Sequence, residues 1–214
     1  GLLRIHFGDQ TSLRNRATEA EMARSLLLRG TTRRTRQQIS DELDRLKARV
    51  TINGDNASTE VAFETVRENL EPLGKLLTEI LRQPSFPPDE FEQLRQATLL
   101  RWEAARSDPQ QLAVTGLSRR LNPYPQGDPR AAPAIEERLA DLKAATLDRT
   151  RQFYRDFYGG ARAELALAGD FEPADVEKQV AELAAGWTSP QPYAELKRPY
   201  QAIPAAREAL ETPD

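Results

Sequence analysis

Residues 49–66 read RVTINGDNASTEVAFETV, and this stretch carries the clearest strand signal in the chain. Apolar and polar residues alternate on both sides of the sequence NGDN at 53–56, which has the composition of a tight turn. The pattern predicts two antiparallel strands, over 49–53 and 58–66, joined as a hairpin.

A further strand and two helices are predicted before this hairpin. In residues 2–7, apolar and polar side chains alternate as they do in a half-buried strand. Residues 18–29 have helical spacing and are followed by Gly30, a typical helix C-cap residue. Thr35 and Gln38 have the spacing of a capping box, which predicts the start of a second amphipathic helix.

After the hairpin the spacing predicts mainly helices. A stripe of leucines predicts a helix that is capped by Asn69 and ends at about Leu81. Further helices are predicted over 89–106, 109–121, 134–145, 147–158 and 173–185, and a short strand over 163–168. This order predicts an α+β fold, in which a largely antiparallel sheet has helices packed on one face.

The last part of the chain differs from the rest in composition. After Trp187, prolines recur without glycine and without a sustained period, which is typical of an extended, semi-stiff linker. We therefore expect a folded domain over 1–187 and a linker over 188–214 that leads to a following domain. The strand that begins at the second residue likewise suggests that the polypeptide continues upstream.

The overall composition excludes several functional classes. The 214 residues include 33 Asp+Glu, 30 Lys+Arg, one histidine and no cysteine. The net charge of -3 argues against a dedicated nucleic-acid binder, and the lack of cysteine excludes a thiolate metal site. The longest apolar run, Leu26–Leu28, is far too short for a membrane-spanning helix.

Few residues indicate chemistry by themselves. His6 is the sole imidazole, and no motif places a catalytic partner beside it. Four arginines between two predicted helices either attract an acidic partner or lie solvated in a loop. They are Arg29, Arg33, Arg34 and Arg36.

Five short segments, taken in order, carry a family resemblance. They are EMARSLLLRGT (21–31), FPPDEFE (86–92), NPYPQG (122–127), YRDFY (154–158) and LALAGDF (165–171). Their order and spacing resemble those of the pitrilysin/insulinase zinc peptidases, which are related to mitochondrial processing peptidase. The resemblance extends to about Trp187 and implies a helix-backed antiparallel sheet.

The resemblance also implies a zinc site whose residues this chain has lost. Active members carry His-x-x-Glu-His on the first helix and, as third zinc ligand, a glutamate on a later helix. These positions correspond to Glu21, Arg24, Ser25 and, at or near it, Glu92. A catalytic zinc needs three protein ligands, and a guanidinium cannot deprotonate water. We therefore expect no catalytic residue, no metal ligand and no cofactor in this chain.

The implied role is that of a non-catalytic half. Members of the family enclose a chamber between paired halves, one of which commonly keeps the fold and loses the metal. Such a half gives structural support and a peptide-enclosing surface to a zinc-bearing catalytic half, on the same polypeptide or in a partner subunit. By resemblance to bacterial relatives, a periplasmic location is expected.

Three questions stay open at this level. Arg24 either pairs with Glu21 or Glu92 in the vacated site or lies solvated on the helix surface. The chain could instead be a free-standing module that captures peptides along an edge strand. An active zinc peptidase with its motif elsewhere is a further alternative, but it needs two histidines and the chain has one.

Overall fold

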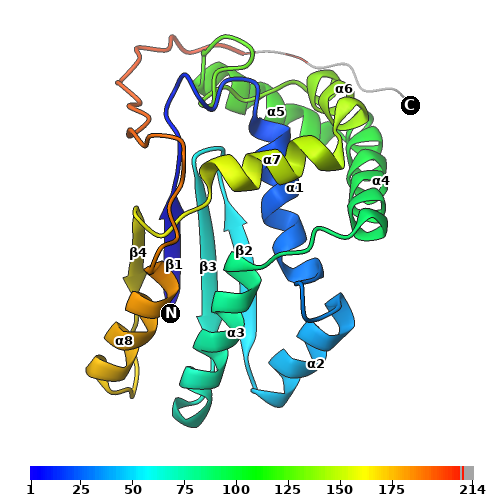
Figure 1. Cartoon of the computed structure of the whole chain (residues 1–214). Coiled ribbons are helices and arrows are strands. Elements are labelled where there is room, and N and C mark those ends of the chain that lie inside the picture. The colour runs from blue at the N-terminus through cyan, green and yellow to red at the C-terminus, as the bar shows by residue number, and fades with distance from the viewer. Residues whose placement is uncertain (208, 210–214) are drawn as a thin grey trace.

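The computed structural model describes residues 1–207 and 209, and Figure 1 shows their arrangement. The elements are β1 (Leu2–His6), α1 (Ala17–Leu26), α2 (Arg36–Arg45), β2 (Arg49–Gly54), β3 (Ser58–Glu64), α3 (Leu70–Arg82), α4 (Pro88–Ala105), α5 (Pro109–Leu121), α6 (Ile135–Ala144), α7 (Leu147–Phe157), β4 (Ala163–Ala166) and α8 (Pro173–Ala184). Short 3-10 turns, η1 (Leu27–Arg29) and η2 (Arg67–Asn69), follow α1 and precede α3.

The strands form one antiparallel sheet in the order β2-β3-β1-β4. β1 lies inside the sheet because it pairs with both β3 and β4, and Leu3 is opposite Val61 and Leu165. The predicted hairpin is formed by β2 and β3. Gly54 begins its turn with φ 146, where an added Cβ would collide with the backbone of Ser58.

Helices cover one face of this sheet, as Figure 1 shows for α3 and α8. On the covered face, Leu3, Ile5 and Val61 are at most 5% exposed. On the opposite face Arg4 of β1 pairs with Glu60 of β3, as expected when successive side chains of a strand alternate between the two faces. The predicted α+β fold with helices on one face is confirmed.

Aromatic residues of α7 and its C-terminal end fill the core between the sheet and α1. The ring of Phe7 lies 5.6 Å from that of Phe153 and 5.4 Å from that of Tyr158, between centroids. Tyr158 shares a 2.7 Å hydrogen bond with the hydroxyl of Thr59 on β3. Burial raises the pKa of Tyr158 to about 12, so its hydroxyl stays protonated at neutral pH.

The predicted elements match the observed ones to within a few residues, with one difference in capping. Thr35 and Gln38 form the predicted capping box of α2. Asn69 precedes α3 but makes no side-chain cap. Its Nδ2 instead donates to the carbonyl oxygen of Leu46 at 2.9 Å, which ties α3 to the end of α2.

The predicted linker, 188–214, contains no helix or strand in the part that the structure describes. It nevertheless lies against the domain, since the backbone N–H of Ala194 donates to the carbonyl of Gly8 at 3.0 Å. Residues 208 and 210–214 of this prediction lie outside the described residues. Among the described residues, no helix combines the length and the apolar character needed to cross a bilayer.

Candidate functional site: a charged cleft beside α1

A polar cleft of about 1480 Å³ opens beside α1, and we call it the α1 cleft. Its walls are α1, the β2–β3 turn, the C-terminal end of α5, the loop over 122–133, and residues of α6 and α7. In Figure 1 this is the region around the blue helix α1 and the loops above it. The cleft contains Glu21 and Arg24, two of the positions that the resemblance assigns to the lost zinc site.

Two loops are locked together at the rim of the α1 cleft. Asn15, with φ 57, donates its backbone N–H to the carbonyl of Gly127 at 2.9 Å. Gln10 donates to the carboxylate of Asp128 at 3.1 Å, and Arg130 pairs with the same carboxylate at 2.7 Å. The hydrogen bond from Arg130 lowers the pKa of Asp128 to about 2, so this rim pair is ionised at neutral pH.

Glu21 is held between two arginines from different helices. Its carboxylate oxygens lie 3.6 Å from Arg101 of α4 and 3.5 Å from Arg138 of α6. The guanidinium of Arg138 also lies 4.6 Å from the ring centroid of Trp102. Burial lowers the pKa of Arg138, but an arginine still carries its positive charge at neutral pH. The position that the resemblance assigns to the first zinc ligand therefore holds a carboxylate that faces two cations.

Arg24 lies in the same cleft and is held by the backbone. Its Nη1 donates to the carbonyl oxygen of Asp55, in the β2–β3 turn, at 2.8 Å. Among the described residues it makes no ion pair with Glu21 or Glu92. Of the two alternatives that the sequence left open, the ion pair is not formed, and Arg24 instead joins α1 to the hairpin turn.

Ser25 and Glu92 do not join this cluster. Ser25 is exposed on α1. Glu92 is exposed on α4, where its carboxylate is bound by Arg95 at 2.8 Å. Glu92 precedes Arg101 by nine residues, which is about 13 Å along the axis and about half a turn around it. The α4 side chain that reaches Glu21 is Arg101 rather than Glu92.

The sequence pattern did not single out Arg101 or Arg138. The signal that could have found Arg101 is the buried stripe of α4, formed by Phe91, Thr98 and Ala105. Arg101 lies close to this stripe on a helical wheel, whereas Glu92 lies farther round the helix. Arg138 could not be found in this way, because its contact depends on how α6 packs beside α1.

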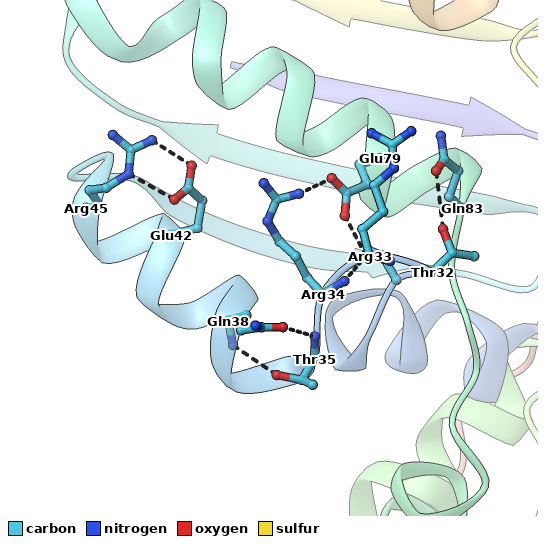
Figure 2. A network of polar contacts seen from close by, with 10 residues as sticks. Thr32, Arg33, Arg34, Thr35, Gln38, Glu42, Arg45, Glu79 and Gln83 are labelled. Atoms are coloured by element: carbon cyan, nitrogen blue, oxygen red, sulfur yellow. Dashed lines mark hydrogen bonds and ion pairs between the residues drawn. The ribbon is translucent and has the colours of Figure 1, made fainter.

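The arginine cluster before α2 is largely neutralised by carboxylates. Figure 2 shows Arg34 paired with Glu79 of α3, whose other oxygen accepts a 2.5 Å hydrogen bond from Thr31. Glu79 is only 7% exposed, so this pair fixes the loop to α3. The pair lines a second, smaller hollow between α2 and α3, of about 920 Å³.

Two of the remaining arginines of this cluster are also paired with a carboxylate. Arg29 and Arg36 share Glu90, at 2.7 and 3.4 Å. Arg33 is exposed and makes no carboxylate contact within the described residues. The cluster therefore holds its own elements together, and the structure does not support the suggestion that it attracts an acidic partner.

The described residues do not fit a zinc site. His6 lies on the face of the sheet that carries Arg4, with its Nε2 3.8 Å from Glu164, and is not among the residues that line the α1 cleft. No group of three His, Asp or Glu side chains that could hold a metal ion occurs among the described residues. The carboxylate of Glu21 is already paired with Arg101 and Arg138, so it is a poor ligand for a metal ion.

The sequence matches two family models. That of the insulinase family, peptidase family M16, matches residues 3–133 and thus includes α1 and α4. This chain belongs to the insulinase family. A second model, described as the peptidase M16 inactive domain, matches residues 144–214 of this insulinase-family chain. No curated protein sequence matches the chain with significance.

Two solved structures share the fold. The crystal structure of the peptidase M16 inactive domain from Pseudomonas fluorescens superposes with a TM-score of 0.79 at 21% identity, over 93% of this chain and 48% of that one. A protease from Helicobacter pylori superposes with a TM-score of 0.74 at 16% identity, over 95% of this chain and 47% of that one. The chain therefore spans about half the length of these two structures.

Proposed function

We propose that this chain is a non-catalytic domain that supports the catalytic half of a zinc peptidase and contributes a wall to the chamber that encloses its peptide substrate. The contact of Glu21 with Arg101 and Arg138 carries this proposal. A carboxylate bound by two guanidiniums is a poor metal ligand, because a bound zinc ion would lie beside two fixed positive charges.

The shape of the α1 cleft supports the enclosing role. Its volume of about 1480 Å³ is large enough for several residues of an extended peptide. The contacts of Asn15 with Gly127 and of Gln10 with Asp128 keep its rim in place.

Metal content and hydrolysis by the isolated chain test the non-catalytic assignment. Protein purified without chelators is analysed for zinc by mass spectrometry and assayed with a fluorogenic peptide mixture. We expect substoichiometric zinc and no hydrolysis above a heat-denatured control. One equivalent of zinc together with peptide hydrolysis would show an active peptidase instead.

A free-standing peptide-binding module is the second candidate function. β2 is an edge strand of the sheet, and its last residue, Gly54, lines the α1 cleft. An extended peptide could add to this edge through backbone hydrogen bonds. Peptide binding by the isolated chain, combined with failure to co-purify with a His-x-x-Glu-His-bearing half, would favour the module.

A further inference from the structure

The α1 cleft has more positive than negative side chains, although the chain as a whole is acidic. Among the described residues, seven arginines and six carboxylates line it, whereas the net charge of the chain is -3. The difference within the cleft is small by itself. Its significance depends on which of these charges are already engaged by neighbours.

The carboxylates of the cleft are mostly engaged within the protein. Glu19 pairs with Arg149, Glu21 with Arg101 and Arg138, and Asp128 with Arg130. Two others accept hydrogen bonds from backbone N–H groups.

Asp55 accepts from Ala57 N–H at 2.8 Å, and Glu137 accepts from Ala134 N–H at 2.7 Å. The remaining carboxylate, Asp141, is desolvated by its surroundings, which raises its pKa, and it interacts with Arg138 and Arg149. The carboxylates of the cleft are therefore largely engaged by neighbouring groups, and few of them are available to bind a cationic ligand.

Three arginines of the cleft have no carboxylate partner among the described residues. Arg24 donates to the Asp55 carbonyl at 2.8 Å, and Arg198 donates to Oδ1 of Asn122 at 3.0 Å. Arg119 of α5 is exposed and lines the cleft. Each guanidinium carries five N–H donors in a planar fork that matches a carboxylate. Most of these donors remain free for a ligand.

The three guanidiniums come from different walls of the cleft. Arg24 belongs to α1, Arg119 to the C-terminal part of α5, and Arg198 to the extended segment that follows α8. A ligand that meets all three must therefore be elongated and must carry several negative groups. A peptide with spaced Asp or Glu side chains has both properties.

We propose that the α1 cleft binds an acidic peptide segment, with its carboxylates on Arg24, Arg119 and Arg198. This inference rests on the proposed function and specifies the substrate class that the wall would hold. The net charge of the chain is -3, so the excess of arginines that lines this cleft does not reflect a generally basic chain.

Fluorescence anisotropy with three labelled peptides tests the charge preference. The peptides are identical in length and differ only in whether the spaced positions are glutamate, glutamine or lysine. We expect the glutamate peptide to bind about tenfold more tightly than the glutamine peptide, as the sum of three exposed ion pairs. Its affinity should fall as salt is raised, because salt screens exposed charges.

Single substitutions test the three contacts. Arg24→Gln, Arg119→Gln and Arg198→Gln are each expected to weaken the glutamate peptide about twofold and to leave the glutamine peptide unchanged. Arg33→Gln is the matched control, because Arg33 is also exposed and lacks a carboxylate partner among the described residues, but it lies outside this cleft. Circular dichroism confirms that each variant is folded.

Each outcome bears on the inference. Equal affinity for the three peptides would overturn the acidic preference and leave the enclosing role intact. Binding of the glutamate peptide that Arg33→Gln weakens as much as the cleft variants would place the site elsewhere. If no peptide binds, the inference is overturned, while the zinc and hydrolysis measurements still decide the non-catalytic assignment on their own.

Discussion

At the scale of single residues, the pair of Asp128 and Arg130 stabilises the rim of the α1 cleft. The pKa of Asp128 is held at about 2, against 3.8 for the free side chain. Because the folded pKa is the lower one, the ionised carboxylate stabilises the fold above about pH 4. This stabilisation is lost as the pH falls from about 4 through 2, where the carboxylate becomes protonated in both states.

We therefore predict a pH-dependent effect of Asp128→Asn. At pH 7 the substitution should lower the free energy of unfolding by about 2 kcal/mol, because a nearly buried Arg130 loses its charged partner. The difference from the parent chain should shrink as the pH falls below about 3. Urea unfolding at a series of pH values measures both. A difference that is the same at pH 7 and at pH 2 would contradict the assigned role of the pair.

At the scale of elements, the packing of α4 on α1 determines which side chains of the two helices lie close enough to bind the same metal ion. Arg101 reaches Glu21, whereas Glu92 is bound by Arg95 on another side of α4. Restoring the first-helix motif alone leaves two cations at the site. A change in α4 is needed as well.

We predict that Glu21→His, Arg24→Glu and Ser25→His together do not restore zinc binding through Glu92. Adding Arg101→Glu to the triple variant should restore it, because this change removes a cation and supplies a carboxylate where α4 reaches α1. Isothermal titration with zinc compares the two variants. Zinc uptake by the triple variant that disappears on Glu92→Gln would instead place Glu92 at the site.

The elements differ in how far their sequence determines them. The hairpin and the α2 capping box follow from local patterns, turn chemistry at 53–56 and the spacing of Thr35 and Gln38, so they could be predicted. The sheet order could not, because pairing of β1 with β3 and β4 joins distant segments. Asn69 does not cap α3 because it is the last residue of the 3-10 turn η2 and its backbone, with φ -104 and ψ 1, lacks the extended conformation of an N-cap.

The candidate site, too, could be predicted from the sequence only in part. Glu21 and Arg24 are three residues apart on one helix, so their common location in the cleft follows from helical periodicity. The partners that neutralise Glu21 come from α4 and α6, through packing that no local pattern specifies. The sequence therefore predicted that Glu21 and Arg24 lie together but not which residues contact them.

At the scale of the whole molecule, the chain has the insulinase-family fold, and we propose that it contributes charge and shape to the functional unit. Its fold matches structures of about twice its length. We expect the functional unit to include a second body that faces this cleft. Cleavage of peptides would then require the assembled chamber, whereas the α1 cleft of this chain contributes to binding them.

Reconstitution tests this account most directly. A His-x-x-Glu-His-bearing half from the same source is assayed for hydrolysis of an acidic fluorogenic peptide, alone and after addition of this chain. The account predicts that the two proteins co-elute, that zinc resides only in the added half, and that hydrolysis increases on mixing. Unchanged hydrolysis without co-elution, or zinc-dependent hydrolysis by this chain alone, would contradict it.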